Sequence, residues 1–171
     1  AYLLAYWCLA ATLALVARDV GACLALNARL LIGCAFACAV LWKVVLSPDY
    51  LDGRFFRVSL LTDARFADVA QVVGGLGADQ LAALRAFVRG DPAAAGAVLP
   101  SRLVGLAHVA TLWTVAIEAA VAVAFLSPLG RGLSAARHGL LIAFCITTYA
   151  VATVAGFGWL LLAMGTAQCD P

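Results

Sequence analysis

The chain has 171 residues, of which 65% are hydrophobic and only 12% are charged, and its mean hydropathy is +1.04. Soluble domains are about half apolar and about a quarter charged, so this composition excludes an ordinary soluble protein and indicates an integral membrane protein. The 11 basic and 9 acidic residues leave a net charge of +2. Such a balance offers no surface that could follow a phosphate backbone, which excludes nucleic acid as a partner.

Four apolar stretches reach, or nearly reach, the roughly 20 residues that a helix needs to cross the bilayer. They cover about residues 1–17, 20–46, 103–126 and 138–165. The last is longer than a perpendicular span, so we expect it to tilt or bend near Gly156 and Gly158. The sequence therefore predicts an all-α fold, an integral membrane four-helix bundle that occupies residues 1–171 as a single membrane domain.

The charges are concentrated between the second and third stretches, where residues 48–103 carry six acidic and six basic side chains. The segment TDARFADVAQVV fits a short amphipathic helix that Thr62 caps, with Phe66, Val69, Val72 and Val73 on one face. ADQLAALRAFVRG fits a second helix, whereas FFRVSLL suits either a strand or an interfacial segment. We therefore expect an extracytoplasmic insertion, residues 48–102, made of short amphipathic helices. These helices either lie on the bilayer and cap the bundle, or form a lid over a pocket in the outer leaflet.

The short connections between the stretches set the orientation. Arg18 and Arg29 flank the first connection, and Arg131 and Arg137 flank the other. Because basic residues favour the cytoplasmic side, we expect a multi-pass protein of the inner (cytoplasmic) membrane. Both termini and the loop 48–102 then face outward.

Three ionisable residues inside the predicted spans are candidate functional residues, because such groups are costly in a bilayer. Lys43 and His108 lie at similar depth near the outer surface, and Glu118 lies deeper. Each also has a structural explanation. Lys43 can extend to the interface, His108 can hydrogen-bond in helix packing, and Glu118 can hold helices together as a protonated or paired carboxyl. If the protein is a catalyst, these three residues are the candidates for catalysis.

No metal site is expected. Cys34 and Cys38 share a helix face, but no histidine or carboxylate lies at their level. His108 and His138 are predicted at opposite ends of consecutive spans, too far apart to share a haem.

The segment ARLLIGCAFACAVLWKVVLSPDY, residues 28–50, resembles the first helix of DoxX-like membrane proteins, a group that includes relatives of the MauE type. In that group an Arg-Leu pair opens a glycine-containing helix that ends in a lysine shortly before a Pro-Asp turn. The resemblance carries over Arg29, Gly33 and Lys43. It implies a redox-associated or quinone-linked membrane component, or a maturation partner. The chain departs from the group in having a helix before this segment and a large outer insertion.

Two functions follow from these observations. The first is a non-catalytic accessory subunit of a larger membrane protein complex, which would need no cofactor. Its outer loop would dock partner subunits, and small residues on helix faces would allow close packing. Those residues are Gly33, Ala35, Ala39, Ala116 and Ala120. The alternative is a DoxX-like redox component that handles a quinone or a small thiol near Lys43 and His108. The sequence favours the first function, so an enzyme is the less favoured interpretation.

Overall fold

The computed structural model describes residues 2–90, 98–128, 134–151, 154 and 156–169. Over these residues the chain is helical and contains no strand, which confirms the all-α prediction. The chain divides into two compact units. Unit 1 comprises Ala1–Leu41, Ala116–Ala150 and Val154–Pro171, and unit 2 comprises Trp42–Val115 and Val151–Thr153.

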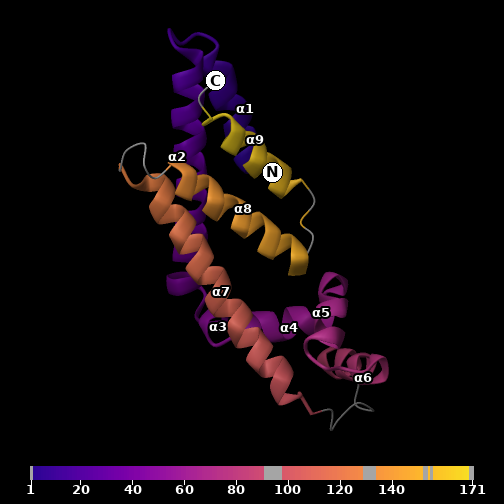
Figure 1. Cartoon of the computed structure of the whole chain (residues 1–171). Coiled ribbons are helices and arrows are strands. Elements are labelled where there is room, and N and C mark those ends of the chain that lie inside the picture. The colour runs from indigo at the N-terminus through magenta and orange to yellow at the C-terminus, as the bar shows by residue number, and fades with distance from the viewer. Residues whose placement is uncertain (1, 91–97, 129–133, 152–153, 155, 170–171) are drawn as a thin grey trace. The chain divides into compact units, whose positions relative to one another are not determined.

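Unit 1 contains the long apolar helices (Figure 1). Its elements are α1 (Tyr2–Ala14), α2 (Val20–Leu41), the second half of α7 (Ser101–Leu126), α8 (Ser134–Val151) and α9 (Phe157–Thr166). Asp19 starts α2 by accepting a hydrogen bond from the backbone N–H of Ala22 at 2.9 Å, as a helix N-cap does. The core joins Ile32 and Phe36 of α2 to Phe125 of α7. It extends to α8 and α9, where Leu141, Phe144, Leu161 and Met164 are buried.

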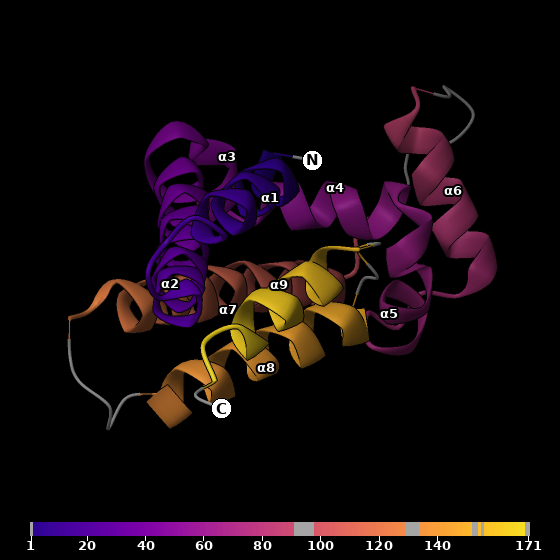
Figure 2. The same cartoon turned by 90° about the horizontal axis from the view of Figure 1, so that it is seen from above.

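The predicted fourth span, which we expected to tilt or bend near Gly156 and Gly158, is two separate helices in the structure. Helix α8 ends at Val151, and α9 begins after Gly156, whose φ of +78° favours glycine. The hydroxyl of Tyr149 accepts a hydrogen bond from the Gly158 N–H at 2.7 Å and donates one to the Val154 carbonyl. These bonds satisfy backbone groups that the interrupted helix leaves exposed. Helices α8 and α9 then lie side by side in both views (Figure 1 and Figure 2).

Unit 2 contains the charged insertion, and its helices are short. They are the π-helical turn η1 (Trp42–Leu46), α3 (Pro48–Leu51), α4 (Arg54–Thr62), η2 (Ala64–Phe66), α5 (Ala67–Val72), α6 (Ala78–Val88) and the first half of α7. They share a core of their own, which contains Tyr50, Phe56, Leu60, Leu61, Phe66, Leu76, Leu81, Leu84 and Leu103. The insertion is therefore a folded unit that packs on the start of α7.

Within the insertion the structure excludes one alternative and corrects two expectations. FFRVSLL is helix α4 and not a strand, because Phe56, Leu60 and Leu61 point into the core at helical spacing. Thr62 does not cap the following turn. Its hydroxyl donates to the Val58 carbonyl, and the Asp63 carboxylate caps instead by accepting from the Arg65 N–H at 3.0 Å. The proposed apolar face of the next helix is incomplete: Phe66 is buried, whereas Val72 and Val73 are exposed.

Two helical segments are long and apolar enough to cross a membrane, Val20–Leu46 and Ser101–Leu126. They coincide with the second and third predicted spans. Tyr2–Ala14, Ala135–Val151 and Phe157–Thr166 are apolar but shorter.

Candidate functional site

A polar site is built on the turn that follows the second apolar segment. Pro48 occupies the first turn of α3, where a proline fits a helix start. Gly53 ends this short helix with φ +75°, and α4 begins at the next residue. This reversal places Asp49 and Asp52 beside Arg54 and Arg57.

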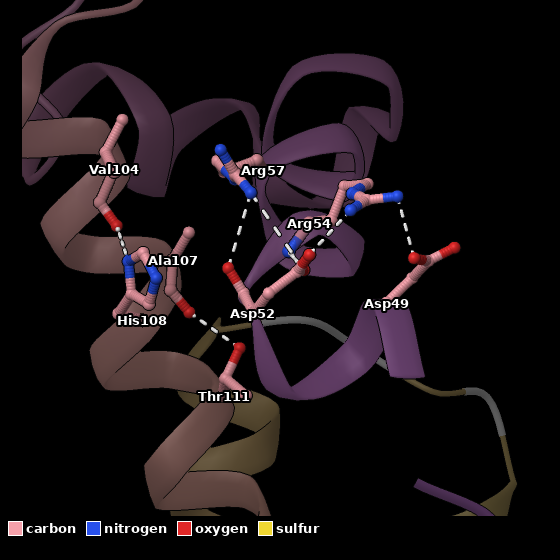
Figure 3. A network of polar contacts seen from close by, with 8 residues as sticks. All are labelled: Asp49, Asp52, Arg54, Arg57, Val104, Ala107, His108 and Thr111. Carbon is pink, nitrogen blue, oxygen red and sulfur yellow. Dashed lines mark hydrogen bonds and ion pairs between the residues drawn. The ribbon is translucent and has the colours of Figure 1, made fainter. Parts of the chain in front are cut away.

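The four charged side chains pair with one another (Figure 3). The Arg54 guanidinium lies 2.7 Å from the Asp49 carboxylate and 2.8 Å from that of Asp52. The Arg57 guanidinium donates to the Asp52 carbonyl at 3.3 Å and lies 3.9 Å from the Asp52 carboxylate. The backbone N–H of Arg54 donates to that carboxylate at 2.8 Å. This backbone hydrogen bond, helped by the two guanidinium groups, lowers the pKa of Asp52 below its ordinary value.

His108, on α7, packs against the same turn. Its Nδ1 lies 2.9 Å from the Val104 carbonyl oxygen. Because a carbonyl only accepts, Nδ1 carries the proton, and in the neutral ring Nε2 is left as a hydrogen-bond acceptor. A Cβ placed on Gly53 would lie 3.3–3.4 Å from the imidazole atoms. Gly53 therefore has two reasons to be glycine, its positive φ and the closeness of this ring.

Lys43 contacts the turn through Tyr50. Its ammonium nitrogen lies 5.4 Å from the centre of the Tyr50 ring, within cation–π range. The Tyr50 ring is buried and packs against Phe55 and Phe56 at centroid distances of 5.1 and 5.8 Å. Lys43 and His108 thus both contact the segment 50–53, as their similar predicted depth led us to expect.

Glu118 belongs to the other unit. It is on α7 and only 7% exposed. The candidate residues therefore divide, with Lys43 and His108 in unit 2 and Glu118 in unit 1. Over the residues that the structure describes, no group of three or more His, Cys, Asp or Glu side chains is placed to hold a metal ion.

The small residues differ in their surroundings. Gly33 is buried against Leu126, at the end of α7. Ala35, Ala39 and Ala120 are half-buried, and Ala116 is exposed. Arg29 is half-buried on α2, one helical turn before Gly33.

Sequence reasoning missed two polar contacts that organise the units. The Arg85 guanidinium donates to the Leu61 carbonyl at 2.6 Å and joins α6 to the end of α4. The Arg137 guanidinium donates to the Ala124 and Ser127 carbonyls at 2.7 and 3.0 Å. In the sequence, Arg137 is only one of the arginines beside the short connections that predict the orientation in the membrane. No signal in the sequence indicates the role of Arg85.

Comparison of the chain with protein-family models, with curated proteins and with solved structures finds no match.

Proposed function

We propose that the protein is a non-catalytic accessory subunit of a membrane protein complex and that unit 2 docks a partner subunit. The observation that carries this proposal is the construction of unit 2. It is a folded unit with its own core, its clustered charges pair internally, and large apolar side chains remain exposed. These are Leu51, Phe55 and Val58 on α3 and α4, and Val72, Val73, Phe87 and Val88 on or after α5 and α6. A surface with many exposed apolar side chains is typical of a site of protein–protein interaction.

The membrane arrangement belongs to the same proposal. In it, the apolar helices form a four-helix bundle in the inner membrane, with α8 and α9 together serving as the fourth member. Arg18, Arg29 and Arg137 face the cytoplasm, in accordance with the positive-inside rule. Arg131, the fourth arginine used to predict the orientation, lies outside the described residues. The start of α1 and unit 2 face outward. Helix α9 runs back along α8, because a Cβ at Gly158 would lie 2.7 Å from Tyr149 and one at Gly165 would lie 3.2 Å from Leu141. Cys169 therefore returns to the side at which α8 begins, in place of the outward C-terminus that the sequence led us to expect. The two segments long enough to span support membrane insertion.

Docking is tested by site-specific photo-crosslinking in native membranes. A photoreactive residue replaces Val72, which is 83% exposed on α5, and the matched control replaces the exposed polar neighbour Gln71. We expect Val72 to crosslink to one partner protein in near-stoichiometric yield, with a much lower yield from Gln71. Equal and diffuse labelling from both positions would contradict the proposal.

Orientation is tested at Cys169, which is exposed near the C-terminus. A membrane-impermeant maleimide should label it only after the inner membrane has been ruptured, because α9 returns Cys169 to the side at which α8 begins, and Cys169→Ser should abolish that labelling. Labelling of cells whose inner membrane is intact would contradict this orientation.

A second function has one observation in its favour. The fixed Nδ1–H of His108 leaves Nε2 available to a ligand beside the turn that Lys43 also contacts. A DoxX-like redox component would use this nitrogen to accept a hydrogen bond from the hydroxyl of a reduced quinone or from a small thiol. The fit is limited, because Asp52, Arg54 and Arg57 already pair with one another. A quinone spectrum in the gently purified protein that disappears in His108→Ala would favour this function over the docking role.

A further inference from the structure

Arg137 is a buried cation fixed at the end of α7. Its side chain is 9% exposed, and it donates to the Ala124 and Ser127 carbonyls at 2.7 and 3.0 Å. The last carbonyls of a helix lack partners within the helix and carry partial negative charge. Their hydrogen bonds therefore hold the guanidinium in one place.

Arg29 approaches the same helix end from α2. Gly33 packs against Leu126, the last residue of α7, with a Cβ position only 2.7 Å from a Leu126 methyl carbon. Arg29 lies four residues before Gly33, on the same face of the helix. Because α2 and α7 run in opposite directions in unit 1 (Figure 1), Arg29 lies beyond the end of α7. The guanidinium groups of Arg29 and Arg137 are close enough to repel each other.

The Arg29 side chain has unused hydrogen-bonding capacity. It is half-buried, and its Nε is buried and makes no hydrogen bond to the residues that the structure describes. The acidic residue nearest to Arg29 in the sequence is Asp19. It lies about 15 Å from Arg29 along α2, at 1.5 Å per residue, and it caps the start of that helix. Two neighbouring guanidinium groups repel, so an anion bound by both would stabilise them. The planar donor fork of arginine matches the oxygens of a phosphate.

We propose that Arg29 and Arg137 form a phosphate-binding site at the end of α7. In this site Arg137, held by the α7 carbonyls, supplies a fixed positive charge, and Arg29 supplies hydrogen-bond donors. The phosphate is that of an anionic phospholipid headgroup or free inorganic phosphate. Basic sites between membrane helices on the cytoplasmic side bind such headgroups. The phosphate chemistry is independent of the proposed docking role, and only the lipid source depends on membrane insertion.

The test uses the full chain in nanodiscs of three kinds. The first contain phosphatidylcholine alone, the second add phosphatidylglycerol, and the third are phosphatidylcholine nanodiscs with inorganic phosphate in the buffer. The thermal midpoint and the number of phosphatidylglycerol molecules retained in native mass spectrometry are recorded. Arg29→Gln removes the charge, and Arg18→Gln is the matched control, because Arg18 is exposed and lies before α2. Arg137 is left unchanged because it also holds the end of α7.

A headgroup site predicts that phosphatidylglycerol raises the midpoint of the native chain and of Arg18→Gln, whereas inorganic phosphate does not. Arg29→Gln should bind phosphatidylglycerol about tenfold more weakly, as expected for the loss of one charge-assisted hydrogen bond. A rise with inorganic phosphate that Arg29→Gln removes would identify free phosphate as the ligand. The proposal is overturned if neither addition raises the midpoint, if Arg29→Gln keeps the full rise, or if Arg18→Gln loses as much as Arg29→Gln.

Discussion

Replacing Gly33 with alanine should destabilise unit 1, although alanine is the better helix former. The added Cβ would lie 2.7 and 2.8 Å from Leu126 side-chain carbons and 3.3 Å from the Leu126 backbone nitrogen. The Leu126 side chain can rotate away, since it is 39% exposed. The backbone nitrogen can move only if the two helices separate by a few tenths of an ångström.

The size of the effect is the difference between two opposing terms. Overpacking a closely packed site costs about 1–3 kcal/mol, whereas glycine to alanine within a helix gains about 0.5–1 kcal/mol. We therefore expect Gly33→Ala to lower the free energy of unfolding by about 1 kcal/mol, near the middle of the range of about 0–2.5 kcal/mol that the overpacking cost less the helix gain allows. Reversible unfolding of the detergent-solubilised protein, followed by tryptophan fluorescence, measures this difference.

Gly139 supplies the matched control. It lies within α8, and a Cβ placed there would meet no atom within 4 Å. Gly139→Ala should therefore raise stability by about 0.5–1 kcal/mol through helix propensity alone. In a Leu126→Ala background the cost of Gly33→Ala should shrink, because the main clash has been removed. If Gly33→Ala proved as stabilising as Gly139→Ala, the close approach of α2 to α7 would be refuted.

Three further changes test other contacts. Asp52→Asn should make the free energy of unfolding less dependent on pH in acid. The pKa of Asp52 is lowered, chiefly by the hydrogen bond from the Arg54 N–H, so the contribution of its carboxylate to stability is complete above about pH 3.8 and is lost as the pH falls through the lower pKa of the folded state. Acid unfolding of the two proteins should therefore converge at low pH, and parallel curves would contradict this. Arg85→Leu leaves the Leu61 carbonyl of α4 without its donor and should lower the free energy of unfolding by about 1–2 kcal/mol, which faster proteolysis of the insertion would show. Arg89→Leu, at an exposed position one helical turn further on, should change the rate of proteolysis little. Tyr149→Phe should increase hydrogen exchange at the start of α9 by about tenfold, the loss of one hydrogen bond, and unchanged exchange would contradict the role of its hydroxyl.

The long apolar helices could be predicted because their signal is local. The predicted stretch 103–126 corresponds to α7, Ser101–Leu126. The stretch 20–46 corresponds to α2 and η1 together. An uninterrupted apolar run without proline favours a helix over its whole length, so composition alone places the boundaries within a few residues.

The fourth stretch shows where local reasoning fails. The sequence predicts a weak point at Gly156, but a glycine is compatible with a bend or with a complete interruption of the helix. The side chain of Tyr149 helps to stabilise the interruption, because its hydroxyl bonds to backbone groups beyond the end of α8. That pairing depends on the position of the folded chain after the break, which periodicity does not encode.

The polar site around Gly53 was predictable only where its contacts are local in the sequence. The pairs Asp52–Arg54 and Asp63–Arg65 join residues two positions apart, which a turn brings together locally. The contact of His108 with Gly53 and the approach of Arg29 to Arg137 join distant parts of the chain. Depth along the helices placed His108 near the right level, but only the folded chain shows which segment lies against its ring.

The two units use their charges differently, and this difference bears on both proposals. In unit 2 the carboxylates of Asp49, Asp52 and Asp63 already hold arginine partners at 2.6–2.8 Å, so a docking partner gains little by presenting charge to these groups. Recognition there should depend on the exposed apolar side chains and should vary little with salt. At the end of α7 a half-buried guanidinium lies beside a second one, and an anion is the ligand that stabilises such a pair. Binding of inorganic phosphate there would weaken with salt, whereas a headgroup held in the bilayer would be less sensitive. Salt dependence measured separately for partner crosslinking and for phosphate binding therefore distinguishes the two sites on one protein.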